Sequence, residues 1–172
     1  EDRHLCYCLS PIVSCIMLLL LSGLPGSGKS TIARAYVARY GGVHISSDLI
    51  RTELGLRGHY QPGDKERVYA TMLERTTDVL SKGGKAVVDG TLYSEAIRVP
   101  FEAVAQDCGA SVFRVQVRAQ EATVRERLQK SRPDSEADFA VYEKIRDQYE
   151  PWLLPHLELW SDSDPVDALV TT

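Results

Sequence analysis

Apolar runs alternate with stretches of helical periodicity along most of this chain. The apolar runs predict strands at about residues 16–22, 43–46, 85–89, 111–117 and 156–160. The helical period is clearest over residues 65–81, where one side carries Val68, Met72, Thr76, Val79 and Leu80. Alternating strands and helices need crossover connections, which produce a mostly parallel sheet with helices on both faces. We therefore expect an α/β fold of three layers around a five-stranded, mostly parallel sheet.

Turn and capping residues predict where the other elements begin and end. Further helices are expected at about residues 31–40, 49–54, 94–107, 120–131 and 139–149, with a short one opened by Pro165. Ser47 or Asp48 is the natural N-cap of the helix over 49–54. Residues 55–64 are rich in glycine and polar residues and predict a surface loop. Residues 132–135, Arg-Pro-Asp-Ser, predict a turn or short lid.

The first 16 residues differ from the rest of the chain. The apolar run from Leu9 to Leu21 is interrupted by Ser10, Pro11 and Ser14, and it is too short to span a bilayer comfortably. The acidic start lacks the cationic beginning of a secretory signal. We interpret residues 1–16 as an N-terminal extension of uncertain origin and residues 17–172 as one domain. We expect a cytoplasmic protein without a membrane partner.

Composition narrows the class of protein. A chain of 172 residues with 44% hydrophobic and 26% charged residues is typical of a globular domain with a core. Its net charge of −4 gives no overall field that attracts nucleic acid, which is therefore a less favoured partner. The four cysteines show neither CxxC nor zinc-type spacing. Aromatic residues expected in the core are Phe101, Phe113, Phe139, Trp152 and Trp160.

Residues 23–30 carry the most informative motif. They read Gly-Leu-Pro-Gly-Ser-Gly-Lys-Ser and match G-x-x-x-x-G-K-[ST], the phosphate-binding loop of nucleoside-triphosphate enzymes. A glycine-rich turn before a lysine would read the same, but the strand before it and the helix after it are the context that the motif requires. Lys29 is expected to reach the β- and γ-phosphates as a catalytic residue, and Ser30 to ligate Mg²⁺. Contacts to ATP are predicted for Gly23, Pro25, Gly26, Ser27, Gly28, Lys29, Ser30 and Thr31.

Two further segments should share a cleft with this loop. Ligands of parallel sheets bind at the carboxyl ends of the strands, where residues 47–51 and 89–91 also lie. Phosphoryl transfer to an alcohol needs a carboxylate that orients the hydroxyl and accepts its proton. Asp48 is the candidate base, and Arg51, on the same helical face, is the candidate acceptor ligand. A structural role explains Asp48 and Arg51 equally well, because they could form a helix N-cap and an ion pair in the first turn. This structural role is compatible with the catalytic one.

Asp89 is the candidate metal acid. It ends an apolar strand, where the acid that holds Mg²⁺ is found in enzymes with such a loop. An acid at a strand end can equally cap the next turn. We predict that Ser30 and Asp89 hold the metal, and that Asp89 and Thr91 contact the substrate.

Arginines near the predicted lid are candidates for transition-state stabilisation. The helix over 120–131 is basic, and a solvated face is the ordinary interpretation of such a helix. Arg132 leads into the turn over 132–135, and closure of that turn would bring its guanidinium to the transferring phosphoryl group. We predict a catalytic role for Arg132 and a nucleotide contact for Arg127.

Four segments resemble the small P-loop kinases of the "predicted kinase" group. This group is related to the polynucleotide 5′-hydroxyl kinase domain and, more loosely, to gluconate, shikimate and adenylylsulfate kinases and chloramphenicol phosphotransferase. The segments are LLLLSGLPGSGKSTIAR, HISSDLIRTELG, KAVVDGTLYSEAIR and VRERLQKSR with SEADFAVYEKIRDQYEP. The resemblance implies Asp48 as base, Arg51 as acceptor ligand, and lid arginines at Arg127 and Arg132. Residues 1–16 have no counterpart in the family.

Together these features predict an ATP-dependent kinase that uses Mg²⁺ and transfers the γ-phosphoryl group of ATP to a hydroxyl of a small-molecule acceptor. A polynucleotide 5′-hydroxyl kinase is an alternative, although the acidic balance of 24 carboxylates against 20 basic residues disfavours a nucleic-acid groove. A non-catalytic ATP-binding regulatory protein is a second alternative, and Asp48 is the residue that distinguishes it. The acceptor and the oligomeric state are not specified by the sequence.

Overall fold

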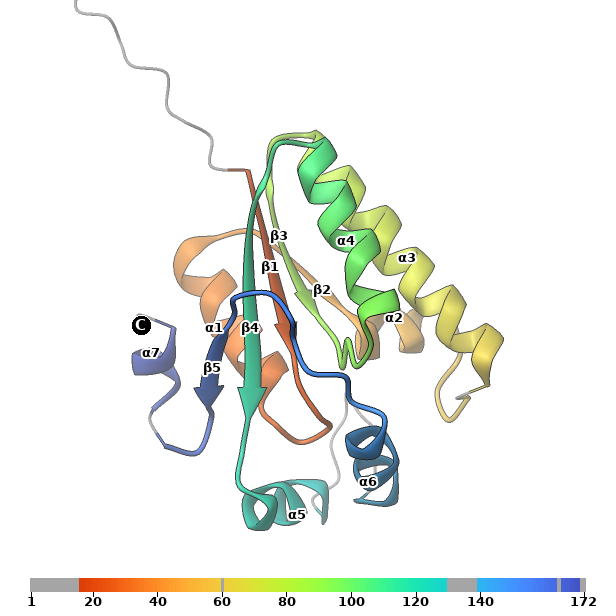
Figure 1. The fold of residues 1–172 in the computed structure, drawn as a ribbon, viewed down its shortest axis with the longest axis vertical. Coiled ribbons are helices and arrows are strands. Elements are labelled where there is room, and N and C mark those ends of the chain that lie inside the picture. The colour runs from red at the N-terminus through yellow and green to blue at the C-terminus, as the bar shows by residue number, and fades with distance from the viewer. Residues whose placement is uncertain (1–15, 60, 130–138, 164, 171–172) are drawn as a thin grey trace, which may run out of the picture.

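The computed structural model describes residues 16–59, 61–129, 139–163 and 165–170. They form a sheet whose five strands run in the order β2-β3-β1-β4-β5, with every neighbouring pair parallel. The strands are β1 Met17–Ser22, β2 Val43–Ser46, β3 Lys85–Asp89, β4 Ser111–Arg118 and β5 Leu157–Trp160. The predicted sheet is confirmed, and all strands present their carboxyl ends at one edge (Figure 1).

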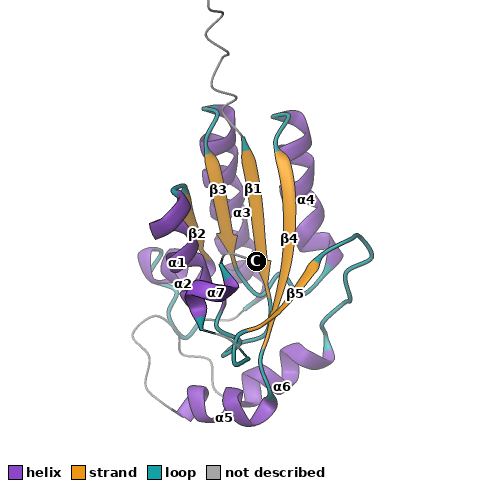
Figure 2. Cartoon of the chain, turned by 90° about the vertical axis from the view of Figure 1, so that its left-hand side faces the viewer, coloured by secondary structure: helices purple, strands orange, loops and turns teal. Residues whose placement is uncertain are grey.

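Helices cover both faces of this sheet. They are α1 Lys29–Tyr40, α2 Ser47–Glu53, α3 Pro62–Ser81, α4 Glu95–Asp107, α5 Glu121–Gln129, α6 Phe139–Asp147 and α7 Val166–Leu169. In Figure 1, α3 and α4 lie on one side of the sheet and α1 and α7 on the other. Helices α5 and α6 lie beyond the carboxyl ends of the strands, as the turned view also shows (Figure 2). The three-layer prediction is therefore confirmed.

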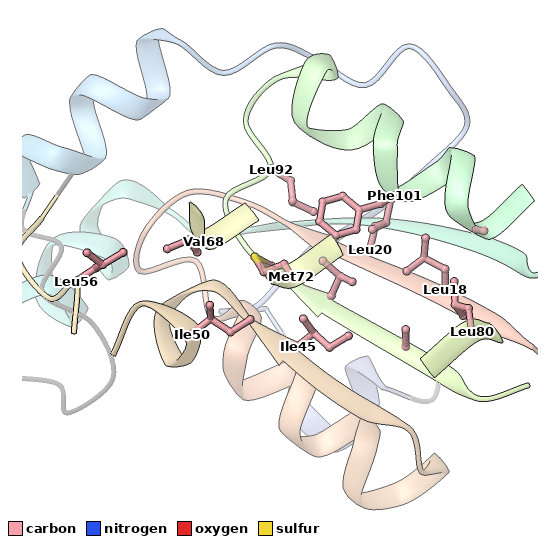
Figure 3. Close-up of a cluster of buried hydrophobic side chains, with 13 residues drawn as sticks. Leu18, Leu20, Ile45, Ile50, Leu56, Val68, Met72, Leu80, Leu92 and Phe101 are labelled. Carbon is pink, nitrogen blue, oxygen red and sulfur yellow. The ribbon is translucent and has the colours of Figure 1, made fainter. Parts of the chain in front are cut away.

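The central strand β1 is buried along its whole length because both faces of the sheet are covered. Leu18 and Leu20 pack into the core beneath α3 and α4, and Leu19 and Leu21 into the core beneath α1. In Figure 3, Leu20 lies close to Phe101 of α4 and Leu92 of the loop after β3. Full burial of such a side chain contributes about 1.5–3 kcal/mol. The unbroken apolar run of β1 is thus what a strand between two cores requires.

The boundaries of two helices differ from the sequence predictions. Helix α3 begins at Pro62 instead of residue 65, because proline is accommodated in the first turn, where its missing N–H costs no hydrogen bond. Helix α2 begins at Ser47, and its N-cap position is occupied by Ser46, whose side chain makes no capping hydrogen bond. The prediction of Ser47 or Asp48 as N-cap is therefore wrong, and Asp48 lies inside the first turn.

Two aromatic residues expected in the core are exposed. Phe113 is 51% exposed and Trp160 is 36% exposed, whereas Phe101 is 1% exposed. Phe113 lies in the first half of β4, which has no neighbouring strand on its outer side in the described part of the chain, because β5 pairs only with residues 115–118. The predicted lid over 132–135 and nearly all of the predicted extension lie outside the described residues. Among the helices that the structure describes, none has the length and apolar character needed to cross a membrane.

Candidate active site

The phosphate-loop motif lies between the carboxyl end of β1 and the first turn of α1. Gly28 occupies the N-cap of α1 with φ 94° and ψ 6°, a left-handed conformation that side chains with a Cβ rarely adopt. A Cβ on Gly28 would lie 2.9 Å from Ser161 Oγ, and one on Gly23 would overlap the Val117 carbonyl. These two positions require glycine for conformation and for space.

The curved loop forms a cradle for an anion. In the described part of the chain, the backbone amides of Gly26, Gly28 and Ser30 donate no hydrogen bond to another protein group. They lie at the positive end of the α1 dipole, where anions are stabilised. The ammonium group of Lys29 folds over the loop and donates to the Leu24 carbonyl at 3.0 Å. Loop amides and a lysine together fit the phosphates of a nucleotide.

Asp89, the last residue of β3, is a buried carboxylate beside this cradle. It is 2% exposed, and His44 Nε2 of β2 lies 3.0 Å from its Oδ2. Burial opposes ionisation, but the hydrogen bond from His44, the charge of Lys29 and a hydrogen bond from Ser30 hold the pKa of Asp89 below its usual value. Asp89 is therefore ionised at neutral pH.

Ser30 and Asp89 together present a hydroxyl and a carboxylate oxygen. No cluster of three or more His, Cys, Asp or Glu ligands occurs among the residues described. One carboxylate and one hydroxyl nevertheless suit Mg²⁺, which binds few protein oxygens and completes its shell with water and phosphate oxygens. The donor set present here fits that ion.

Main-chain hydrogen bonds connect the loop after β3 to the phosphate loop. The Gly23 amide donates to the Thr91 carbonyl at 3.4 Å, and the Gly90 amide donates to the Leu21 carbonyl at 3.3 Å. Helix α2 begins beside this loop, because a Cβ on Gly90 would lie 3.5 Å from Ser47 Oγ. The three segments that the sequence predicted to share a cleft are therefore adjacent in space.

Asp48 and Arg51 lie on α2, where the first is half-buried in the first turn and the second is near the end. Arg51 Nη1 donates to the His59 carbonyl in the loop between α2 and α3. Both side chains act on the hydroxyl of Tyr69 of α3: burial chiefly raises its pKa, Asp48 raises it further, and Arg51 lowers it. Asp48 and Arg51 therefore lie within electrostatic range of Tyr69.

The backbone is strained in the loop after β3. Leu92 has φ 46°, which is uncommon for a residue with a branched side chain, and its side chain is fully buried. Tyr69 forms a hydrogen bond with the Leu92 backbone. Residues held in such conformations cluster at functional sites.

Arg127 lies against the opposite flank of the phosphate loop. From α5, its Nη1 donates to the Gly26 carbonyl at 3.1 Å and to Ser161 Oγ at 2.8 Å, and its Nη2 donates to the Ser161 carbonyl at 3.3 Å. The sequence placed Arg127 near the nucleotide, and the structure places it on the loop. Arg132 lies outside the described residues.

Two polar contacts of the site escaped the sequence analysis. His44 received no role, yet it is the hydrogen-bond partner of Asp89. Ser22, directly before the phosphate loop, is bonded to the Tyr149 hydroxyl at 2.8 Å and accepts from Trp152 Nε1 at 3.0 Å. The signal for His44 was a polar residue in a short apolar strand, but its partner depends on β2 lying beside β3, which the sequence did not specify.

Comparison with known proteins identifies the family. A family model described as an AAA domain (AAA_33) matches residues 18–152. The chain belongs to this family. The AAA_33 match includes the phosphate loop, α2, the end of β3 and α6, and it confirms the resemblance to small P-loop kinases.

Solved structures share the fold of this AAA_33 domain. They include the APS kinase CysC of Mycobacterium tuberculosis in complex with AMPPNP and APS (20% identity, TM-score 0.66, 90% of this chain and 93% of that chain). A gluconokinase from Sinorhizobium meliloti 1021 has 17% identity and a TM-score of 0.67, over 91% and 89% of the two chains. Kti12 from Chaetomium thermophilum, in complex with ADP-AlF3, has 22% identity and a TM-score of 0.70, over 89% and 94%.

A curated relative matches a short part of the AAA_33 domain. It is an adenylate kinase from Pyrococcus furiosus, 62% identical over 39 residues. These residues are 22% of this chain and 18% of the relative. The match therefore covers a small fraction of either protein.

Proposed function

We propose that this protein is an ATP-dependent kinase that transfers the γ-phosphoryl group of ATP to a hydroxyl of a small-molecule acceptor. Membership of a P-loop kinase family supports the donor. The observation that carries the proposal is the half-buried Asp48 in the first turn of α2, beside the loop that is hydrogen-bonded to the phosphate loop. A purely nucleotide-binding protein does not require a carboxylate there.

Each residue of the site has a role in this reaction. Lys29 and the loop amides would hold the phosphates, Arg127 would contact the nucleotide, and Ser30 and Asp89 would hold Mg²⁺. Mg²⁺ supplies neutralisation of phosphate charge when bound. Thr91 borders the substrate. Arg132 is assigned to the transition state on the sequence argument alone.

Proton transfer is the task of Asp48. Its carboxylate accepts the proton of the acceptor hydroxyl as the oxygen forms a bond to phosphorus and the bond from phosphorus to the leaving ADP oxygen breaks. Arg51, one helical turn away, orients the acceptor. The cytoplasmic location predicted from the sequence stays a prediction.

Replacement of Asp48 tests the proposal. The Asp48→Asn variant should transfer phosphate about 10²–10⁴-fold more slowly, because an amide cannot accept the proton. Its ATP affinity should remain within a few-fold of the original. Transfer from γ-labelled ATP would be measured over sugars, nucleosides, aminoglycoside-type hydroxyls and 5′-hydroxyl oligonucleotides.

Asp78→Asn is the matched control, because Asp78 is an exposed acid on α3 that pairs with Lys82. Unchanged transfer in Asp48→Asn would remove the base assignment. Labelling of oligonucleotides alone would favour a polynucleotide 5′-hydroxyl kinase. ATP binding without transfer to any acceptor would favour a regulatory protein.

A further inference from the structure

The carboxyl ends of β1 and β4 border a cavity of about 470 Å³, a volume that suits a small organic molecule. Helix α6 and the segment between α6 and β5 form its other side. Its wall includes Gly23 and Leu24, the first two residues of the phosphate loop. The cavity therefore adjoins the proposed donor site.

The position of Leu24 places the cavity at the γ-phosphate end of that site. Lys29, which is assigned to the β- and γ-phosphates, donates to the Leu24 carbonyl at 3.0 Å. The amide of Gly23 donates to the Thr91 carbonyl in the loop beside α2. The cavity thus lies on the side of the phosphate loop from which an acceptor approaches the transferred group.

Aromatic side chains form much of the cavity wall. They are Tyr142, Tyr149, Trp152 and Trp160. The Ser22 hydroxyl forms a hydrogen bond with the Tyr149 hydroxyl at 2.8 Å and accepts one from Trp152 Nε1 at 3.0 Å. The guanidinium of Arg98 lies 4.4 Å from the centre of the Trp152 ring. These contacts hold two of the rings in place, and rings that are already fixed bind a planar ligand at a small cost in entropy.

Gln116 of β4 is a buried polar side chain in this wall. It is 8% exposed, and its carboxamide forms no hydrogen bond with another residue in the part of the chain that the structure describes. The fully enclosed side-chain atoms without a partner there belong to Ser27 and Arg98, so the carboxamide of Gln116 is open to the cavity. A buried amide without partners is unfavourable, and a ligand with a hydrogen-bond donor beside an acceptor would satisfy both of its ends.

The charged side chains around the cavity already have partners. The guanidinium of Arg118 lies 3.1 Å from the Glu158 carboxylate, and that of Arg146 lies 3.2 Å from Asp147. A paired guanidinium attracts an anion less strongly than an unpaired one does. The cavity therefore favours a neutral ring over a phosphate or carboxylate group.

We propose that this cavity binds a neutral, planar heterocyclic ring of the phosphate acceptor, and that the acceptor is a small hydroxyl compound of the nucleoside type. The ring lies against the aromatic wall, and its hydroxyl group points toward the phosphate loop. A nucleobase presents a hydrogen-bond donor beside an acceptor, the pattern that a glutamine carboxamide such as that of Gln116 pairs with. This inference rests on the proposed kinase function, because it specifies the acceptor of that reaction.

Matched ribosides test the inference. Adenosine, guanosine, cytidine and uridine are compared with methyl riboside, which has no ring in the place of the base, and with a phenyl C-riboside, whose ring has no hydrogen-bonding edge. ADP release from Mg·ATP is measured with each compound. At least one nucleoside should have a KM at least tenfold below those of both controls. Equal or better use of methyl riboside or of the phenyl riboside would overturn the inference.

Variants of the wall assign the effect to this cavity. Gln116→Met keeps the length of the side chain and removes its hydrogen-bonding groups, so it should raise the KM of the nucleoside about tenfold and leave that of the phenyl riboside unchanged. Trp160→Leu removes part of the aromatic wall and should raise the KM of both. Gln106→Met is the matched control, because Gln106 is exposed on α4, and it should change neither KM.

Two results with Gln116→Met would overturn the inference. An equal rise in the KM of the nucleoside and the phenyl riboside would indicate a structural role for Gln116. A rise in the KM of ATP in place of that of the nucleoside would show that the cavity holds the base of the donor.

Failure of this inference differs from failure of the kinase proposal. Slow ADP release with water as acceptor, together with calorimetric binding of Mg·ATP, shows that the phosphoryl-transfer machinery works. If both are present and only hydroxyl compounds without a heterocyclic ring are phosphorylated, the kinase proposal stands and the nucleoside-type acceptor is rejected. If Mg·ATP does not bind, the kinase proposal itself fails.

Discussion

The carboxylate of Asp89 is kept ionised in a buried position by polar neighbours from two other elements. His44 comes from β2 and Lys29 from α1, so the charge of Asp89 depends on elements far apart in the chain. A buried carboxylate that loses a hydrogen-bond donor bears the cost of its own desolvation. If Asp89 holds Mg²⁺ as proposed, His44 is the partner that supports this ligand, and loss of such a partner typically lowers metal affinity by about 10- to 100-fold.

Replacement of His44 tests this support. His44→Ala should lower the free energy of unfolding by about 1–3 kcal/mol, because the buried carboxylate of Asp89 loses a donor. It should also raise the Mg²⁺ concentration needed for half-maximal activity about tenfold or more. Chemical denaturation and a Mg²⁺ titration of ADP release measure the two effects.

His44→Gln, which keeps a donor, should recover part of both losses. His156→Ala is the control, because His156 precedes β5 at the opposite edge of the sheet from β2 and contacts the Leu154 carbonyl. An unchanged Mg²⁺ requirement in His44→Ala would show that His44 does not support the metal site.

At the scale of elements, hydrogen bonds connect the turn after β5 to α5 and, through Arg127, to the phosphate loop. Asp162 Oδ2 accepts the backbone N–H of Gln120 at 2.7 Å at the start of α5, and Ser161 accepts hydrogen bonds from Arg127. The hydrogen bond from Gln120 chiefly lowers the pKa of Asp162, and burial partly opposes it. The ionised carboxylate also complements the positive end of the α5 dipole.

The lowered pKa of Asp162 makes the stability of the folded protein depend on pH in the acid range. Because its pKa is lower in the folded protein, its contribution is present above the unfolded value of about 3.9 and is lost as the pH falls through the folded value. Asp162→Asn should therefore melt at a lower temperature than the original at pH 7, and the difference should shrink as the pH falls below about 4. Melting curves from pH 3 to 7 measure it. A constant difference at all pH values would contradict this account.

Elements with a clear local pattern could be predicted from the sequence, and those that depend on tertiary contacts could not. The apolar run of β1 and the phosphate-loop glycines specify their structure over a few residues. The N-cap of α2 was misplaced because Ser46, Ser47 and Asp48 are all good capping residues and only the end of β2 selects among them. His44 was overlooked for a related reason, because the order of strands in the sheet creates its contact with Asp89.

At the scale of the whole molecule, the proposed donor site joins parts of the fold that are separate in sequence. Lys29 follows β1, Asp89 ends the neighbouring strand β3, and Arg127 comes from α5 after β4. A nucleotide bound across these elements stabilises the folded domain, because the unfolded chain has no such site.

Binding of Mg·ATP should therefore raise the melting temperature of the domain. Mg·ATP at about 100 times its dissociation constant should add about 2.7 kcal/mol, which corresponds to a rise in Tm of about 5–11 °C for a domain of this size. Lys29→Ala should fold normally and lose most of that rise. Thermal melts with ATP, with Mg·ATP and with neither measure it. The absence of any shift for the original protein in saturating Mg·ATP would refute the nucleotide site.

The order of strands also has a consequence for how this protein could diversify. Helix α2 and the start of α3 follow β2 at one edge of the sheet, whereas α5 and the turn after β5 approach the phosphate loop from the other. Residues 52–73, which follow the proposed base Asp48 and the proposed acceptor ligand Arg51, can therefore vary during evolution without disturbing the nucleotide machinery. Transplanting that segment between family members offers a direct route to exchanging their substrate preferences.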